Sequence, residues 1–249
     1  MTVHRFFVPD LDREAGEGRL SEEQSRQASR VLRLAVGDTL CVFDGSGLEY
    51  DARLAVLDKR VWRFEFAAGR RPGREPSLAL TVGLALIRNE RFDLAVQKLT
   101  ELGVSAIVPL SAERSVISYA DARIWAKRRA RIHRIVVEAA EQAERTTLPV
   151  VHAPQTVEEF LKHTHGMDAI ALVERRTDNG LDCQALQGER QALLVGPAGG
   201  WSPAELELIE RDARPASLGR LILRSETAAI AGASFLLLAA RHSEDAASE

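Results

Sequence analysis

A glycine-rich stretch late in the sequence has the composition of a ligand-binding loop. It reads V-G-P-A-G-G-W-S over residues 195–202 and includes the end of an apolar run, Leu193–Val195. Glycines let a backbone come close to a ligand, and the free N–H groups before a helix can hold polar groups. Ser202 can cap a helix that has Pro203 at its first position. The stretch is typical of a binding loop, although an ordinary strand-to-helix turn has the same composition.

A second late segment combines charges with apolar residues. Residues 218–227 read L-G-R-L-I-L-R-S-E-T, so Arg224 has apolar neighbours and Glu226 opens a very apolar helix. A charge between a buried strand and a buried helix costs several kcal/mol unless it is paired. We expect either a structural ion pair between Arg224 and Glu226, or a site where both groups face a ligand at the strand ends.

Basic residues are concentrated in one region of a chain whose net charge is −3. Between residues 114 and 134 only Asp121 is acidic, and seven residues are basic: Arg114, Arg123, Lys127, Arg128, Arg129, Arg131 and Arg134. Clustered cations of this kind bind phosphates, although a solvated helix face has the same pattern. Arg30 and Arg33 add to the basic character from an earlier segment. Because aromatic residues are sparse, a single extruded base or backbone contacts are favoured over extended single-strand recognition.

Other common chemistries lack their sequence signatures. We find no phosphate-binding G-x-x-x-x-G-K-[ST] loop, no G-x-G-x-x-G after a strand, no G-x-S-x-G elbow and no H-E-x-x-H pair. His163 and His165 lie in a polar stretch and are expected to be solvated. The two cysteines, Cys41 and Cys183, give neither a disulfide framework nor a C-x-x-C zinc site. Hydrolase and metalloenzyme functions are disfavoured, and no metal is expected.

The composition is that of a soluble globular protein. The chain has 249 residues, of which 45% are hydrophobic and 28% charged, which suggests one large or two modest domains. The first residues are charged too early for a secretory signal. The longest weakly polar run, Thr227–Ala240, is about 14 residues long, whereas a membrane-spanning helix needs roughly 20. We expect a soluble, cytosolic protein.

Two patterns of periodicity meet at a linker predicted over residues 67–77, A-A-G-R-R-P-G-R-E-P-S. Before it, alternating runs predict strands at Thr39–Phe43, Leu48–Leu54 and Val61–Phe66, the first two joined by a tight D-G-S-G turn. One helix is predicted to open at Ser21, because Gln24 completes a capping box. The N-terminal part is therefore expected to be a small, mostly β barrel or sheet.

After the linker, strands alternate with helices. Apolar runs predict buried strands at Leu78–Ile87, Val104–Leu110, Ala169–Val173 and Ala192–Val195. Helices are predicted from a cap at Asn89 to Gly103, from about Ala122 onward, over Pro203–Asp212 and over Glu226–Ala240. This order predicts an α/β domain with a mostly parallel sheet.

Eight segments, in order, resemble one family over nearly the full chain. They are H-R-F-F-V at 4–8, R-V-L-R-L-A-V-G-D at 30–38, F-D-G-S-G at 43–47, Q-K-L-T-E-L-G-V at 97–104, P-L-S-A-E-R-S at 109–115, E-A-A-E-Q-A-E-R at 138–145, G-P-A-G-G-W-S at 196–202 and L-G-R-L-I-L-R-S-E-T-A at 218–228. The chain resembles the SPOUT-superfamily methyltransferases that modify N3 of a uridine in small-subunit (16S) ribosomal RNA, the RsmE family.

The resemblance implies a fold and a cofactor. A PUA-like RNA-binding β-barrel is expected over residues 1–72, and a SPOUT methyltransferase domain of α/β class with a deep trefoil knot over residues 73–249. S-adenosylmethionine is expected to lie bent in the knot, in a homodimer whose active sites are near the subunit interface. The cofactor-binding residues implied are Leu172, Glu174, Gly196, Pro197, Gly199, Gly200, Leu218, Gly219, Ile222 and Leu223.

The same resemblance implies where methyl donor and RNA meet. Arg224, Glu226 and Thr227 are expected at the reacting groups, with Arg224 stabilising negative charge on the uracil and Glu226 either a base or an ion-pair partner. RNA contacts are expected from Arg5, Arg30, Arg33, Arg114, Arg128, Arg129, Arg131, Gln142 and Arg145. The chain departs from the family at Ala198, where a Glu is usual, and at Gln27–Ser29, where a His often occurs.

The sequence thus predicts a methyltransferase that acts on N3 of a uridine in 16S ribosomal RNA, within an assembled small subunit. Two alternatives stay open at this stage. One is a related SPOUT enzyme with a different RNA target, because the cofactor loops say little about the substrate. The other is an RNA-binding ribosome-assembly factor without catalysis, for which Ala198 is the only support in the sequence.

Overall fold

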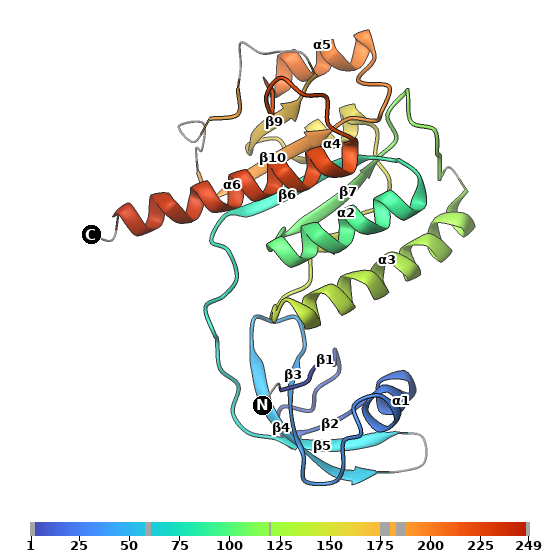
Figure 1. Cartoon of the computed structure of the whole chain (residues 1–249), viewed down its shortest axis with the longest axis vertical. Helices are drawn as coiled ribbons and strands as arrows, with labels where there is room; N and C mark the ends of the chain where they lie inside the picture. Colours follow the sequence, from blue (N-terminus) through green and yellow to red (C-terminus); the bar gives the residue numbers. More distant parts are fainter. Residues whose placement is uncertain (1–2, 58–60, 120, 175–179, 183–187, 248–249) are drawn as a thin grey trace. The chain divides into compact units, whose positions relative to one another are not determined.

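The computed structural model describes residues 3–57, 61–119, 121–174, 180–182 and 188–247. The chain divides into two compact units (Figure 1). The N-terminal unit comprises residues 1–75 and 140–148, and the C-terminal unit comprises residues 76–139 and 149–249. Cys41 is a buried free thiol, whereas Cys183 lies outside the described residues.

The N-terminal unit is a curved sheet with one helix. Its strands are β1 (Arg5–Phe7), β2 (Glu17–Arg19), β3 (Thr39–Phe43), β4 (Glu49–Leu57) and β5 (Trp62–Phe66), and its helix is α1 (Glu22–Arg30). The strand order is β1-β3-β4-β5-β2, with β1 parallel to β3 and the other pairs antiparallel. In the described part of the chain no ladder joins β1 to β2, so the predicted small barrel or sheet is a half-barrel with two open edges.

Local signals in this unit form as the sequence predicts. Ser21 caps α1, and its hydroxyl and the Gln24 side chain satisfy each other's backbone N–H groups. The turn between β3 and β4 has Gly45 and Gly47 at φ +86°, a conformation that side chains disfavour. Phe6, Leu54 and Phe64 fill a core between the sheet and α1. Short-range chemistry therefore fixes these elements.

The predicted linker is more than a free tether, because its charges bind the N-terminal unit. Glu49 is only 1% exposed, and its carboxylate pairs with Arg5 at 2.7 Å, Arg70 at 2.9 Å and Arg74. Burial opposes the negative charge of Glu49, but hydrogen bonds from Arg5 and Arg70 outweigh it and hold the pKa of that carboxyl below its usual range. Two arginines of the predicted linker, Arg70 and Arg74, are thus partners of a buried anion.

The end of helix α3 (Ala122–Gln142) and the turn after it are held in the N-terminal unit by polar contacts. Glu75 pairs with Arg145 at 2.9 Å and accepts the backbone N–H groups of Thr146 at 2.8 Å and Thr147 at 3.1 Å. Burial opposes the charge of Glu75, yet the Arg145 charge and the two N–H groups keep its pKa below the usual value. These contacts explain why residues 140–148 group with a unit from which they are distant in sequence.

The C-terminal unit is a parallel six-stranded sheet with the order β11-β9-β10-β6-β7-β8. The strands are β6 (Ala79–Ala85), β7 (Ala106–Leu110), β8 (Val150–Val151), β9 (Asp168–Leu172), β10 (Arg190–Val195) and β11 (Arg214–Ala216). All paired strands run parallel, which confirms the expected α/β architecture. The strand order reverses direction between β6 and β10, the place where such sheets bind ligands.

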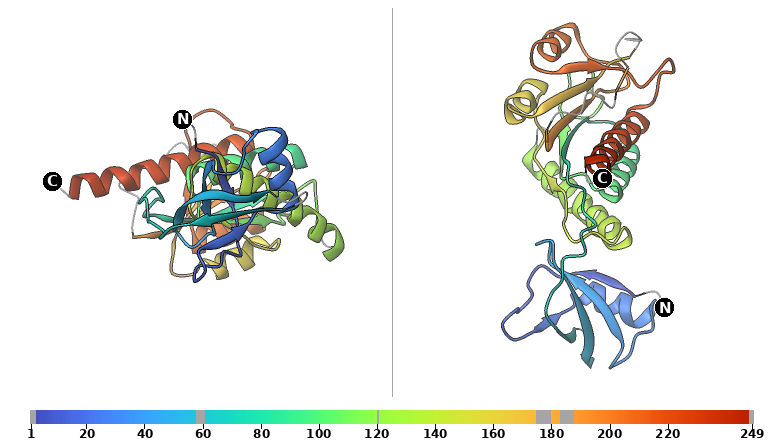
Figure 2. Two further views of the ribbon diagram at one scale, coloured as in Figure 1. Left: turned by 90° about the horizontal axis from the view of Figure 1, so that it is seen from below. Right: turned by 90° about the vertical axis from the view of Figure 1, so that its left-hand side faces the viewer.

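Five helices belong mainly to this unit: α2 (Asn89–Leu102), α3 (Ala122–Gln142), α4 (Val157–His163), α5 (Pro203–Asp212) and α6 (Ser225–Ala247). Figure 2 shows α2 and α6 side by side on one face of the sheet, with α4 and α5 on the other. Gly103 ends α2 in the left-handed conformation, as predicted. Asn89 does not cap that helix: the cap is Arg88, without a side-chain hydrogen bond, and the Asn89 side chain accepts from the Tyr119 hydroxyl.

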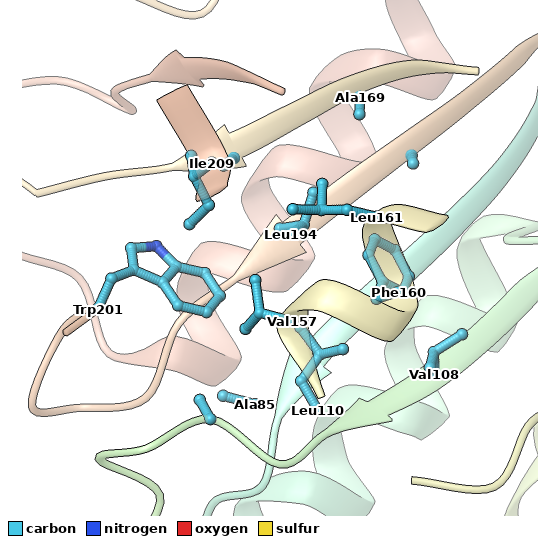
Figure 3. Close-up of a cluster of buried hydrophobic side chains, with 13 residues drawn as sticks. Ala85, Val108, Leu110, Val157, Phe160, Leu161, Ala169, Leu194, Trp201 and Ile209 are labelled. Atoms are coloured by element: carbon cyan, nitrogen blue, oxygen red, sulfur yellow. The ribbon is translucent and has the colours of Figure 1, made fainter. Parts of the chain in front are cut away.

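One core cluster lies between the sheet and the α4–α5 layer (Figure 3). Leu110, Val157, Phe160, Leu194, Trp201 and Ile209 are among its buried members. Gly83 of β6 permits this packing, because a Cβ there would lie 2.9 Å from two carbons of the Phe160 ring. The Trp201 indole therefore joins the loop after β10 to the hydrophobic core.

Candidate active site

A pocket of about 570 Å³ opens at the carboxyl ends of β9, β10 and β11. Three loops that follow these strands line it, together with Arg114 from the segment after β7. All ten residues predicted to bind a cofactor are among the lining residues: Leu172, Glu174, Gly196, Pro197, Gly199, Gly200, Leu218, Gly219, Ile222 and Leu223. The structure thus brings together residues that the sequence separates by as many as 51 positions, between Leu172 and Leu223.

The loop after β10 is held in place by the start of α5. Ser202 caps α5 in a capping box with Glu205, and Pro203 occupies the first turn. The Trp201 indole N–H donates to the Leu172 carbonyl at 3.0 Å, which ties the loop after β10 to the end of β9. Gly196 leaves room for this ring, since a Cβ there would lie 3.0 Å from it. Trp201 lines the pocket and was missed in the sequence, although its place within G-P-A-G-G-W-S was a signal.

The segment over residues 217–224 is a loop, and not the buried strand that its apolar residues suggest. Leu221 is 82% exposed and Ile222 56% exposed, and both line the pocket. The Ser217 hydroxyl accepts the Gly219 N–H at 3.2 Å and donates to the Gly219 carbonyl at 3.0 Å, and Gly219 has φ +112°. Apolar side chains that face an open pocket are suited to cover an apolar ligand.

Arg114 lies in the pocket wall, where the sequence had placed it only among RNA-binding residues. Its Nη1 donates to the Gly199 carbonyl at 3.0 Å. The neighbouring Glu113 N–H donates to Glu205 Oε1 at 2.9 Å, and Glu205 Oε2 accepts the Ser202 N–H at 2.8 Å. One buried carboxylate therefore fastens the segment after β7 to the loop after β10. Ala198, the departure from the family pattern, is exposed and is not a lining residue.

The three residues predicted at the reacting groups are not among the described lining residues of the pocket, but they lie in the chain between lining residues Leu223 and Ala228. Arg224 is exposed and lies in the chain between two lining residues, Leu223 and Ser225. The expected ion pair between Arg224 and Glu226 does not form: Glu226 is buried and pairs with Arg91 of α2 at 3.6 Å. Thr227 is exposed in the first turn of α6. The pairing prediction was wrong because the competing cation comes from a helix far away in sequence.

Three of the predicted RNA-binding cations are occupied inside the protein. Arg5 pairs with Glu49, Arg128 with Asp93 at 2.5 Å and Arg145 with Glu75, and each arginine side chain is less than 10% exposed. A phosphate contact needs an accessible cation without a closer counter-charge. In this structure the three side chains are buried ion-pair partners, which disfavours the RNA contacts predicted for them.

The remaining predicted RNA-binding residues are accessible. Arg30 and Arg33 are exposed in the N-terminal unit, as is Gln142 at the end of α3. Arg129 is exposed on α3, and Arg131 is 61% exposed although it pairs with Asp93 at 2.8 Å. Asp93 thus compensates two of the seven cations counted between residues 114 and 134. Among the exposed basic side chains of α3 are Arg123, Lys127, Arg129 and Arg134.

Metal ligation and membrane insertion find no support in the part of the chain that the structure describes. His163 is exposed there and lies 3.1 Å, Nδ1 to Nε2, from Gln155. No group of three or more candidate metal ligands occurs among these residues. Within the same ranges, every helix is too short or too polar to cross a bilayer.

Comparison with known sequences defines the class of this protein. Residues 74–237 match the family model of the RNA methyltransferase domain, and residues 20–60 match that of the RNA methyltransferase PUA domain. The α/β unit with the strand-end pocket is thus an RNA methyltransferase domain, preceded by a PUA-like domain.

The individual relatives carry one name. Ribosomal RNA small subunit methyltransferase E of a Synechocystis species is 35% identical over 84% of this chain and 69% of its own length. The protein of that name from Rickettsia conorii is 29% identical over 99% of this chain and its full length. The chain belongs to the ribosomal RNA small subunit methyltransferase E family.

Solved structures agree with this assignment. A methyltransferase from Legionella pneumophila with bound SAM superposes with a TM-score of 0.86 at 28% identity, over 96% of this chain and 98% of its own. Ribosomal RNA small subunit methyltransferase E from Neisseria gonorrhoeae, bound to S-adenosyl methionine, gives 0.85 at 29% identity, over 94% and 97%.

Proposed function

We propose that this protein is an S-adenosylmethionine-dependent methyltransferase that modifies N3 of a uridine in 16S ribosomal RNA, on the assembled small subunit. The observation that carries the proposal is the pocket at the ends of β9, β10 and β11, which contains every residue expected to hold the cofactor. The similar solved structures from Legionella pneumophila and Neisseria gonorrhoeae contain that cofactor.

The pocket fits such a ligand in size and in chemistry. Its volume, about 570 Å³, is within the range of small-molecule sites. At Gly200 and Gly219 no described atom lies within 4 Å of the point where a Cβ would be, so a ligand can approach the backbone. Leu218, Ile222 and Leu223 would flank the apolar parts of the cofactor, and backbone groups of residues 196–200 would meet its polar edges.

The bound cofactor would supply a methyl group on a positively charged sulfur that is a good leaving group, so the protein mainly has to position the uracil. Uracil N3 carries a proton at neutral pH, and its removal leaves negative charge on the ring carbonyl oxygens. We assign the stabilisation of that charge to the Arg224 guanidinium, because Arg224 is exposed and is flanked in the chain by lining residues Leu223 and Ser225. Thr227, in the first turn of α6, is a further polar group on this side of the site.

Glu226 is better suited to position Arg224 than to accept the proton of uracil N3. Its carboxylate is buried and already faces the Arg91 guanidinium at 3.6 Å. A compensated, buried anion at the first turn of α6 fixes the start of that helix, and Arg224 directly precedes the helix. We assign proton removal to water, with Arg224 favouring the uracil anion.

The RNA and the second subunit complete the proposal. We propose that the domains are residues 1–72, which help to hold RNA, and residues 73–249, whose last segments thread a trefoil knot around the cofactor. The protein acts as a homodimer in the cytoplasm. Exposed cations in both units, among them Arg30, Arg33 and Arg129, are the proposed phosphate contacts.

Mass spectrometry of 16S ribosomal RNA from a deletion strain tests the activity directly. We expect N3-methyluridine to disappear from one position and to return with the gene. Its persistence would contradict the proposal. Incubation of the purified protein with unmodified small subunits and with naked RNA, followed by mapping of the methyl group, separates this target from another RNA.

The cationic face of α3 has its own test. We expect Lys127→Gln, Arg129→Gln and Arg134→Gln together to weaken RNA binding and to lower the salt slope, by roughly 0.7–0.9 for each phosphate that the variant no longer neutralises. Cofactor affinity, measured by calorimetry, should not change. Arg190→Gln, at the opposite end of β10 from the pocket, is the matched control. An unchanged salt slope would show that these cations of α3 are solvated and do not contact RNA phosphates.

A further inference from the structure

Arg114 is a cation in the pocket wall whose charge is not compensated by the described part of the protein. Its guanidinium donates to the Gly199 carbonyl at 3.0 Å, and that acceptor is neutral. A guanidinium has five N–H donors in a fixed fork, so most of its donors remain available. No carboxylate of the described residues lies within ion-pair distance of it, in contrast to Arg128 and Arg145.

The Arg114 residue is exposed, but contacts with the protein set the position of its side chain. The Glu113 N–H binds Glu205 Oε1 at 2.9 Å, which fixes the backbone directly before Arg114. The same carboxylate accepts the Ser202 N–H and is only 5% exposed. The contact with Gly199 is close, because a Cβ added there would lie 3.3 Å from the Arg114 Cβ. The Cβ atom and the guanidinium of Arg114 therefore both contact the glycine-rich loop at Gly199.

The other charged lining residues do not duplicate this arrangement. Arg220 is exposed on the loop over residues 217–224, and within the described ranges no hydrogen bond holds its guanidinium. Glu174, just after β9, is the acidic residue among the described lining residues. The described part of the lining thus carries two cations and one anion, and within it only Arg114 has a guanidinium fixed against the pocket wall. A fixed, uncompensated guanidinium is suited to bind carboxylate or phosphate oxygens.

We propose that Arg114 forms an anion subsite of the pocket, which binds a carboxylate or phosphate group of the bound reactants. The inference rests on the proposed function, in which two anions approach this pocket: the carboxylate at the methionine end of the methyl donor and a phosphate of the RNA. Arg114 then determines specificity for an anionic group and also supports the loop.

The test compares two donors on the full-length protein. Calorimetry gives the affinities of S-adenosylmethionine and decarboxylated S-adenosylmethionine for the wild type, Arg114→Gln, Arg114→Lys and the control Arg190→Gln. If the bound anion is the carboxylate of the donor, Arg114→Gln lowers the affinity for S-adenosylmethionine roughly tenfold to hundredfold. The affinity for the decarboxylated donor stays nearly unchanged. Arg114→Lys should recover part of the preference, because it keeps the charge and loses the fork.

An RNA arm identifies the other source. If the anion is a phosphate, Arg114→Gln leaves the preference between the donors intact, weakens binding of small-subunit RNA and lowers its salt slope by about 0.7–0.9. The inference is overturned if Arg114→Gln lowers the affinity for both donors equally and leaves RNA binding unchanged, because Arg114 then only supports the loop after β10. It is also overturned if no affinity changes by more than about twofold. A wild type that binds no donor would overturn the proposed function as well.

Discussion

The Glu205 carboxylate ties the glycine-rich loop over residues 196–202 to the segment after β7. It is 5% exposed and accepts two backbone N–H groups, from Ser202 at 2.8 Å and from Glu113 at 2.9 Å. Hydrogen bonds to charged groups contribute about 1.5–3 kcal/mol each. In Glu205→Gln one oxygen still accepts, while the new NH₂ group faces a backbone N–H. We therefore expect the free energy of unfolding to fall by about 2–4 kcal/mol.

Urea denaturation followed by circular dichroism measures this change, and two further variants assign it. Ser202→Ala removes only the acceptor of the Glu205 N–H at 3.2 Å and should cost about 1 kcal/mol. Glu207→Gln, exposed on the same helix, should stay within about 0.5 kcal/mol of the wild type. A Glu205→Gln protein as stable as the Glu207→Gln control would refute the reasoning. Weaker donor binding in Glu205→Gln than in Ser202→Ala would show that the tether to Glu113 shapes the pocket.

Three further predictions concern other parts of the chain. Because the folded pKa of Glu75 is lowered, its stabilisation is present above the unfolded pKa of about 4.3 and is lost as the pH falls through the folded value. The difference in urea midpoint between wild type and Glu75→Gln should therefore be large at pH 7 and shrink in acid, and a constant difference would contradict the ion-pair assignment. Gly219→Ala and Gly166→Ala both place a side chain at positive φ and should each cost about 1–2 kcal/mol, but only Gly219→Ala should weaken donor binding in calorimetry. Gly83→Ala brings a methyl group to 2.9 Å from the Phe160 ring and should lower the free energy of unfolding by about 1–3 kcal/mol, a decrease that urea titration would detect.

Elements with local signals could be predicted from the sequence. The capping box at Ser21, the N-cap at Ser202 and the left-handed end of α2 at Gly103 form as expected, since each depends on residues within one or two turns. Helix α4 was missed although Thr156 and Glu159 form the same kind of box. The sequence contains that signal, T-V-E-E before F-L, so this helix too was predictable from local residues.

Contacts between distant residues could not be predicted in this way. The partner of Glu226 is Arg91, and the partner of Arg5 is Glu49, so each pairing depends on which elements become neighbours in space. The apolar letters at Leu221 and Ile222 have the composition of a buried strand, yet these side chains are exposed in the pocket. Their apolar character is explained by a ligand surface, which hydrophobic periodicity does not predict.

The split membership of the N-terminal unit has a consequence for biosynthesis. Residues 1–75 emerge from the ribosome well before residues 140–148, which provide every hydrogen-bond and ion-pair partner of Glu75 that the structure describes. Until the second piece is made, this half-buried carboxylate lacks its counter-charge. A fragment cut at residue 75 therefore keeps the five strands but lacks its closing segment, and the nascent N-terminal unit matures only after residues 76–139 of the C-terminal unit have been translated.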